Sequence, residues 1–242
     1  MTKIIFLGSG DAFSAGGRFY SSLLAVDDEQ AFLVDAGPTT LLALRRTGIS
    51  VNQIDHIFLT HTHGDHLAGL AFLFLEFQYR ITRDRPITII GASDIAKEVE
   101  KVLSAMYASL SKENRRFAVE YQNIDGQPYR FASGVAHGFP MTHEPFSRGY
   151  RFELGQKTLA ITGDTEWNDN LALLAKGADL FIIECSFFEL DVPGHLSYKI
   201  LDEKLSIVNN QRIILYHLGE DVLERQKEVR FEIAEDLMEI EL

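Results

Sequence analysis

Three histidines and one aspartate crowd the stretch His61-Thr62-His63-Gly64-Asp65-His66. An apolar run over residues 54–59 comes directly before this stretch, and another over residues 67–75 follows it. Imidazole and carboxylate are the ligands that zinc and its neighbours among the divalent metals take in proteins. The spacing therefore predicts a metal-binding loop between a strand and a helix. The alternative is a solvated polar loop that happens to hold several histidines.

Three more candidate ligands stand next to predicted strands, namely His143, Asp164 and His217. Taken singly, each has a plainer explanation, because an aspartate before a helix is commonly an N-cap and a lone histidine is commonly a satisfied polar residue. Strand ends meet at one edge of an α/β sheet, however, so the joint pattern predicts that the three converge on the His61–His66 loop. His137 is a rival to His143, and His56, inside an apolar run, is expected to be structural.

The elements that must position these residues are read from apolar runs and turn signals. Strands are expected at residues 4–7, 22–26, 31–34, 54–59, 87–90, 149–154, 157–162, 180–183 and 212–216. Helices are expected at residues 38–46, 67–79, 93–108 (with Ser93 as N-cap), 165–176 and 197–206, and from residue 220 onward. Hairpins followed by strand–helix alternation, twice over, favour an α/β fold of two stacked mixed sheets with outer helices. No linker divides the sequence, so residues 1–242 are expected to form a single domain.

Composition narrows the function classes. The chain has 23 basic and 35 acidic residues, a net charge of −12, which opposes long-range attraction to nucleic acid. An anionic substrate stays possible, since two divalent cations would supply local positive charge. Cys185 is the single cysteine, which excludes an intrachain disulfide and favours a reducing, cytoplasmic location. No signal peptide or membrane span is expected.

The chain resembles the metallo-β-lactamase superfamily and, within it, the ribonuclease Z-like phosphodiesterases. The resemblance is most specific at residues 60–66 and covers nearly the full length. It includes Phe6-Leu7-Gly8-Ser9-Gly10, Leu33-Val34-Asp35-Ala36-Gly37, Thr142-His143, Gly149-Tyr150-Arg151-Phe152, Thr162-Gly163-Asp164-Thr165, Lys176-Gly177-Ala178-Asp179-Leu180, Ile183-Glu184-Cys185-Ser186-Phe187, Gly194-His195-Leu196-Ser197 and Tyr216-His217.

That resemblance implies a four-layer αβ/βα sandwich with a dinuclear metal site between two sheet edges. It implies one metal on His61, His63 and His143. It implies a second metal on Asp65, His66 and His217, with Asp164 bridging the two. His195 resembles the histidine that contacts the phosphate or the leaving group, although it could also be a polar loop residue. Asp35 and Glu184 are expected either to orient the imidazoles or to be surface carboxylates.

The chain departs from bacterial ribonuclease Z, which carries a long tRNA-gripping arm between the third-motif histidine and the bridging aspartate. His143 and Asp164 are only 21 positions apart, which leaves no room for an arm. We therefore expect a phosphodiesterase for small or short nucleotide-type diesters rather than long nucleic acid, acting through a hydroxide held between two divalent metals. Zinc is the expected metal, with manganese or iron as alternatives. Asp65 would orient and deprotonate the attacking water, and His195 would protonate the leaving oxygen.

Other functions fit the same pattern. A tRNA 3′-processing endonuclease of ribonuclease Z type is the first alternative, and a lactone, thioester or sulfate-ester hydrolase is the second. A metal-binding module without catalysis is a third, although every expected ligand is present. A homodimer is possible if the aromatic segment with Phe72, Phe74, Phe77 and Tyr79 is partly exposed, but a core position is the expected one.

Overall fold

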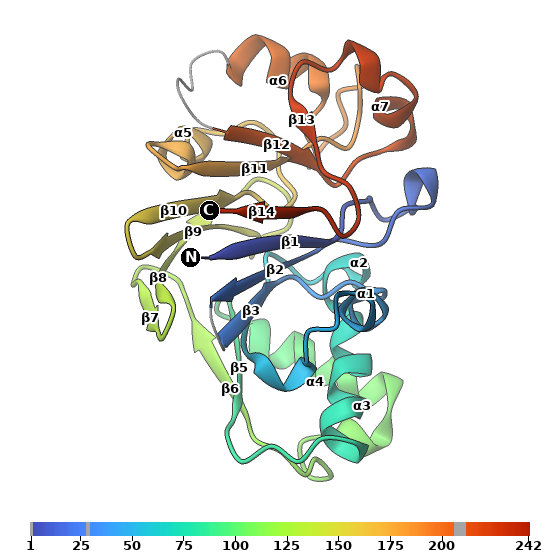
Figure 1. The fold of residues 1–242 in the computed structure, drawn as a ribbon, viewed down its shortest axis with the longest axis vertical. Coiled ribbons are helices and arrows are strands. Elements are labelled where there is room, and N and C mark those ends of the chain that lie inside the picture. The colour runs from blue at the N-terminus through green and yellow to red at the C-terminus, as the bar shows by residue number, and fades with distance from the viewer. Residues whose placement is uncertain (1, 28–29, 206–211) are drawn as a thin grey trace.

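The computed structural model describes residues 2–27, 30–205 and 212–242. Two β-sheets lie against each other at the centre, and helices cover the outer side of each (Figure 1). The arrangement has four layers, in the order helices, sheet, sheet, helices. The expected α/β fold of two mixed sheets with outer helices is confirmed.

The first sheet has the strand order β14-β1-β2-β3-β4-β5-β6. The pairs β14–β1, β1–β2 and β2–β3 are antiparallel, whereas the pairs β3–β4, β4–β5 and β5–β6 are parallel. The bounds are β1 Lys3–Gly8, β2 Ser22–Asp27, β3 Gln30–Val34, β4 Ile54–Phe58, β5 Ile87–Gly91, β6 Val119–Asn123 and β14 Glu239–Glu241.

The second sheet has the strand order β13-β12-β11-β10-β9-β8-β7 and is also mixed. Strands β7 to β10 form antiparallel hairpins, and β10 to β13 run parallel. The bounds are β7 Tyr129–Phe131, β8 Gly134–Pro140, β9 Arg148–Leu154, β10 Lys157–Ile161, β11 Leu180–Glu184, β12 Arg212–Tyr216 and β13 Glu232–Ile233.

Helices of the first half cover the first sheet, and helices of the second half cover the second sheet (Figure 1). The first group is α1 Thr40–Thr47, α2 Gly64–Leu67, α3 Gly69–Tyr79 and α4 Ile95–Met106. The second group is α5 Asn170–Ala175, α6 Tyr198–Lys204 and α7 Glu220–Glu224. No helix in the described ranges is both long and apolar enough to cross a lipid bilayer.

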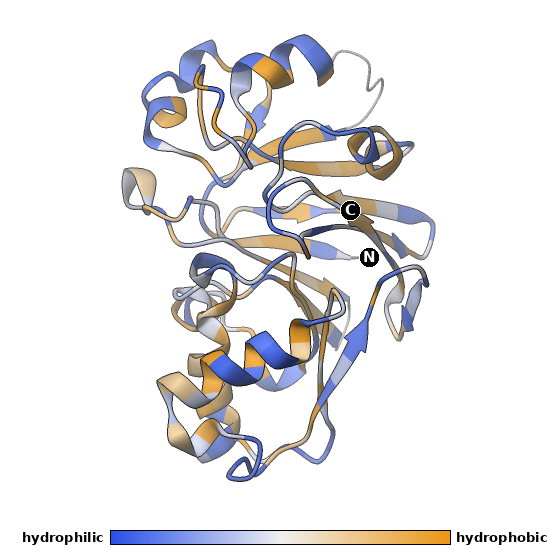
Figure 2. Ribbon diagram, turned by 180° about the vertical axis from the view of Figure 1, so that it is seen from behind, coloured by the Kyte–Doolittle hydropathy of each residue, from blue (hydrophilic) through white to orange (hydrophobic). Residues whose placement is uncertain are grey.

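Three apolar cores hold the four layers together. The alternation of strand side chains explains this, because successive residues point to opposite faces of a sheet. In β1, Ile4 and Phe6 enter the core between the sheets, whereas Ile5 and Leu7 enter the core under α1–α4. A third core lies between the second sheet and α5–α7. Figure 2 shows the result, with largely hydrophobic strands at the centre and mixed colours on the outer helices.

The structure corrects several expected elements. The predicted helix from residue 220 onward is wrong beyond α7, since the chain instead forms β13 and then β14, which pairs with β1. The predicted helix over residues 165–176 is shorter, because α5 begins only at Asn170. Asp94 rather than Ser93 occupies the N-cap position of α4. The predicted end of the helix at Ser206 lies outside the described residues.

Candidate metal centre

The His61–His66 loop leaves the carboxyl end of β4 and turns into the short helix α2. His61 and His66 are buried, whereas His63 is half exposed. The loop lies tightly against the end of β3, because the Ala36 N–H donates to the His66 carbonyl at 2.6 Å. Gly69 permits this approach, since a Cβ at this position would stand 2.0 Å from the Gly37 carbonyl oxygen. The sequence thus fixes both where the loop begins and how closely it approaches the sheet.

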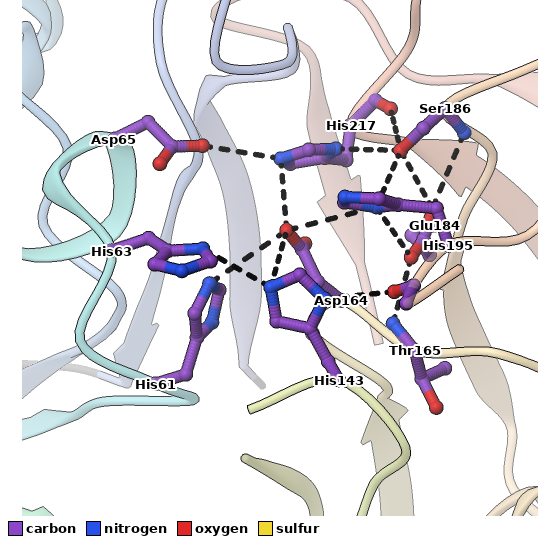
Figure 3. A network of polar contacts seen from close by, with 12 residues as sticks. His61, His63, Asp65, His143, Asp164, Thr165, Glu184, Ser186, His195 and His217 are labelled. Carbon is purple, nitrogen blue, oxygen red and sulfur yellow. Dashed lines mark hydrogen bonds and ion pairs between the residues drawn. The ribbon is translucent and has the colours of Figure 1, made fainter. Parts of the chain in front are cut away.

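The remaining predicted ligands come from the second sheet. His143 follows β8, Asp164 follows β10 and His217 follows β12. The structure brings all three to the His61–His66 loop, and their side chains point into one space between the sheet edges (Figure 3). Four overlapping groups of possible ligand atoms form there among the described residues, each with all its atoms within 4.8 Å of one another. The first two groups hold the predicted ligands, namely His61, His63 and His143 in one and Asp65, His66, Asp164 and His217 in the other. The other two groups include His195, one with His143 and Asp164 and one with Glu184 and His217.

Asp164 lies between the first two groups. Its Oδ2 is 3.7 Å from Nε2 of His61 and 3.9 Å from Nε2 of His143. The same oxygen is 3.4 Å from Nε2 of His217, and Oδ1 is 3.4 Å from Nε2 of His66. A single carboxylate therefore reaches histidines of both groups, which is the placement expected of a bridging ligand.

Hydrogen bonds outside the cluster orient three of the imidazoles. Nδ1 of His66 contacts Asp35 Oδ2 at 2.8 Å, and Nδ1 of His143 donates to the Gly194 carbonyl at 2.9 Å. Nδ1 of His61 contacts the Thr60 hydroxyl, which itself donates to Asp35. Because Nδ1 is engaged in each case, Nε2 faces inward, as a metal ligand requires.

Several of these inward atoms lack a partner. Among the described residues, the buried Nε2 of His61, the buried Nε2 of His66 and Oδ1 of Asp164 make no well-formed hydrogen bond. Nε2 of His66 has only ion-pair contacts, at 3.2 Å to Asp65 and 3.4 Å to Asp164. Buried polar atoms are nearly always satisfied, so three unsatisfied atoms that converge on one point need an explanation. A divalent cation satisfies all of them at once, and imidazole with carboxylate is a donor set that suits it. The residues present fit a metal.

Charges in the cluster support the same interpretation. Burial opposes ionisation of Asp164, but the neighbouring His217 and His66 outweigh burial and hold the pKa of Asp164 well below its ordinary value. Burial lowers the pKa of His217, yet Asp164 and the hydrogen bond to Asp65 raise the pKa of His217 to about 9. In the absence of a cation, the carboxylates therefore hold protons on neighbouring imidazoles. Metal binding displaces such protons.

His195 lies beside the cluster on the loop that precedes α6. Its Nδ1 is 3.2 Å from Glu184 Oε1, and its side chain is 22% exposed. Burial lowers the pKa of His195, but the Glu184 carboxylate outweighs burial and the net pKa is raised. Glu184 is fully buried and is fixed in turn, since it accepts from the Thr165 N–H at 2.7 Å and from the Ser186 hydroxyl at 2.7 Å.

Ser186 has a role that sequence reasoning missed. Its hydroxyl donates to Glu184, so its oxygen accepts from Nδ1 of His217, which lies 3.0 Å away. Ser186 therefore orients His217 as Asp35 orients His66. Asp35 and Glu184 are both buried and contact site histidines, so the surface-carboxylate alternative is wrong for both.

Two other histidines lie apart from the cluster. His137, the rival to His143, stands on β8, and its Nε2 is 3.3 Å from Glu153 on the neighbouring strand. His56 on β4 packs against the rings of Tyr129 and Phe131. Neither belongs to a group of possible metal ligands found among the described residues.

A small hollow of about 70 Å³ opens onto the cluster. It is lined by site residues and by an N-terminal loop, namely Asp11, Ala12, Phe13, His63, Asp65, Asp164, Ser186, Phe187, His195 and His217. The N-terminal loop and Phe187 were not predicted as part of the site. No local signal marks them, because their position depends on the long-range packing of β1 against β2 and β14.

Comparison with known proteins places this site in a family. The sequence model of the family described as "Anti-Pycsar protein Apyc1" matches residues 2–235. A ribonuclease Z of Methanococcus aeolicus is 34% identical over 148 residues, which cover 58% of this chain and 43% of that protein. The chain thus spans about half the length of the curated relatives that it matches.

Two solved structures share the fold. The metallo-β-lactamase fold protein YhfI from Bacillus subtilis superposes with a TM-score of 0.81 at 21% identity, covering 99% of this chain and 98% of the other. The short form of human tRNase Z superposes with a TM-score of 0.77 at 23% identity, with coverage of 99% and 98%. The chain therefore has the metallo-β-lactamase fold, as its resemblance implied.

Proposed function

The chain belongs to the Apyc1 family of anti-Pycsar proteins, and from this premise we propose that it is a metal-dependent phosphodiesterase. The observation that carries the proposal is the position of Asp164 between two groups of inward-facing ligand atoms. The ribonuclease Z relatives support hydrolysis of a phosphodiester at such a site.

Seven side chains would hold two divalent cations. His61, His63 and His143 would hold one, while Asp65, His66 and His217 would hold the other. Asp164 would bridge them. Zinc suits this set of imidazole and carboxylate ligands, and manganese or iron is compatible with it. When bound, such a pair supplies water ionisation near neutral pH and neutralises charge on the phosphoryl oxygens.

Asp65 would orient the attacking water by accepting a hydrogen bond from it. The carboxylate lines the hollow, and its Oδ2 lies 3.2 Å from Nε2 of His66 and 3.3 Å from Nε2 of His217. Burial opposes ionisation, but these two histidines outweigh it, so the pKa of Asp65 lies far below its ordinary value. The carboxylate is therefore ionised and able to accept a hydrogen bond from water at neutral pH.

His195 would donate a proton to the departing oxygen. Nδ1 is engaged by Glu184, and the raised pKa favours the imidazolium form. His195 also lines the hollow, so it reaches a substrate phosphate held there. General acid catalysis of this kind typically contributes about 10²–10⁴-fold to the rate.

Small or short nucleotide-type diesters fit this site better than tRNA. The interval between His143 and Asp164 is filled by the hairpin of β9 and β10, so no arm extends from it. The hollow is small, and the net charge of −12 opposes binding of a long polyanion. The ribonuclease Z names of the curated relatives keep tRNA 3′-processing as the second candidate function.

A substrate panel with the metal-loaded protein tests the proposal. It compares an activated phosphodiester, a cyclic nucleotide, an unprocessed tRNA, a lactone, a thioester and a sulfate ester. We expect hydrolysis of the activated diester and of a small nucleotide diester. Turnover confined to tRNA would establish the second candidate, and turnover confined to the lactone, thioester or sulfate ester would refute the phosphodiesterase proposal.

Matched variants show whether any turnover comes from this site. Asp164→Ala removes the bridging carboxylate and should abolish both metal retention and activity. Asp84→Ala changes the same residue type at a position whose side chain is 94% exposed, and it should behave as the wild type. Full metal content and activity in Asp164→Ala would show that the bridging assignment is wrong.

Two broader expectations remain proposals. A cytoplasmic location rests on the single cysteine, Cys185. Phe74 and Phe77 lie in the core as expected, whereas Tyr79 is 60% exposed at the end of α3, against the expected core position. A homodimer through this segment would use Tyr79 and the partly buried Phe72. A monomeric mass in solution would remove the homodimer from the proposal.

A further inference from the structure

Phe13 is the most exposed large hydrophobic side chain among the described residues, at 86%. It lies on the loop between β1 and β2, which runs beside α7 (Figure 1). In the described part of the chain, Phe13 makes no aromatic or cation–π contact, unlike Phe187 on the same hollow, which packs edge-on against His195. A single exposed apolar residue is ordinary on a protein surface and is no evidence of a function by itself. Whether Phe13 has a function therefore depends on the residues around it.

The loop holds Phe13 in place. Oδ1 of Asp11 accepts from the N–H of Phe13 at 3.0 Å and from the N–H of Ala15 at 3.1 Å. Further along, the N–H of Gly16 donates to Glu220 of α7 at 2.9 Å. Phe13 is therefore presented to solvent by a loop that is hydrogen-bonded within itself and to a neighbouring helix.

The position of Phe13 relative to the catalytic groups suggests what it contacts. Phe13 lines the same small hollow as Asp65, His195 and His217. The hollow has room for a phosphate-sized group and for little more, so the organic part of a diester must leave it across the rim. Phe13 lines the hollow and is 86% exposed, so most of its side chain is open to solvent there.

We propose that Phe13 determines specificity by stacking on the nucleobase of a nucleotide diester whose phosphate lies in the hollow. This inference rests on the proposed phosphodiesterase function. Stacking on an aromatic side chain tolerates every base, because each base has a π-face. The site would thus select for a nucleoside substituent rather than for one particular base.

Two kinds of diester that share the p-nitrophenol leaving group isolate the contact between Phe13 and the base. A nucleoside 5′-(p-nitrophenyl phosphate), with thymidine or adenosine, presents a base, and methyl p-nitrophenyl phosphate does not. Phe13→Ala should lower kcat/KM about five- to a hundred-fold on the nucleoside diesters, the range for loss of one stacked base. On the methyl diester the loss should stay under about twofold, since the chemistry is unchanged.

Two further variants complete the test. Phe13→Tyr keeps the ring and should restore the wild-type preference for the nucleoside diesters. Tyr107→Ala removes a partly exposed ring at the end of α4, outside the hollow, and should change neither substrate. If the wild type cleaves both kinds of diester, two results with Phe13→Ala would overturn the inference. One is an equal loss of kcat/KM on both kinds, and the other is no loss on either. A wild type that cleaves neither diester would instead refute the proposed function, and the stacking inference with it.

Discussion

Asp35 and His66 contact each other through Oδ2 and Nδ1 at 2.8 Å, although 31 positions separate them in the sequence. The same carboxylate accepts from the N–H and the hydroxyl of Thr60, each at 2.8 Å. Asp35 thus fixes both the start of the His61–His66 loop and the orientation of its last imidazole. It does so from a left-handed backbone conformation, with φ of 61°, which aspartate and asparagine tolerate better than most residues.

Asp35→Asn should weaken metal binding without disturbing the fold. Asparagine suits the backbone conformation, but a neutral amide is a poorer acceptor for Nδ1 of His66. Loss of such an orienting partner typically costs about 10–100-fold in metal affinity or activity. Competition with a chromophoric chelator measures the affinity, and circular dichroism checks the fold. Unchanged affinity in a folded Asp35→Asn would show that this contact does not support the metal centre.

His195→Ala should separate proton donation from metal binding. We expect both metals to be retained and kcat on an activated diester to fall about 10²–10⁴-fold. Glu184→Gln should lower kcat in the same direction, because the amide no longer favours the imidazolium form of His195. Elemental analysis alongside steady-state kinetics makes the comparison. A loss of less than about tenfold in His195→Ala would remove the acid role.

Tyr150 ties the two sheets together beneath the site. Its fully buried hydroxyl donates to the Leu59 carbonyl at 2.6 Å, at the end of β4. Tyr150→Phe leaves that buried carbonyl without its partner, which should cost about 1–3 kcal/mol of unfolding free energy. Chemical denaturation with Tyr79→Phe as the exposed control measures the difference. Equal stability of the two variants would contradict this account of the sheet contact.

His56 should make the fold sensitive to acid. Burial against Tyr129 and Phe131 lowers the pKa of His56 below the ordinary value of 6.5. Below about pH 6.5 the unfolded chain therefore binds this proton more readily than the folded chain, so folding stability is lost as the pH falls.

His56→Gln removes that titration. The unfolding free energy of the variant should rise relative to the wild type as the pH drops from about 7 to about 5.5. Subtracting the two plots of unfolding free energy against pH removes the contribution of the other titrating groups, which both proteins share. A difference between the two proteins that stays constant with pH would show that burial of His56 does not act in this way.

Most of the fold was predictable because the central strands are apolar runs with clear turn signals. The strand β6 was missed, since it is an edge strand whose Glu120, Gln122 and Asn123 are exposed and give no apolar run. The C-terminal strand β14 was mistaken for helix because charge dominates there. Its alternation of exposed Glu239, buried Ile240 and exposed Glu241 was a period-two signal that could have been read.

The metal cluster was also predictable, because a dense local motif pointed to it and strand ends indicated where partners would come from. The structure brings all seven predicted ligands together, and their role as metal ligands remains a prediction. Ser186 and Phe13 could not be found in this way. Ser186 acts only once His217, 31 positions away, returns beside it, and Phe13 reaches the hollow only through packing of distant strands. The single-domain assignment of residues 1–242 likewise remains a prediction.

Anomalous diffraction from crystals of the metal-replete protein would locate the ions at this site. We expect two ions in each chain, about 3.5–4 Å apart, with Asp164 between them. His61, His63 and His143 should contact one ion, and Asp65, His66 and His217 the other. Crystals grown with excess zinc or manganese that show no ion among these side chains would show that the seven residues do not form a metal centre.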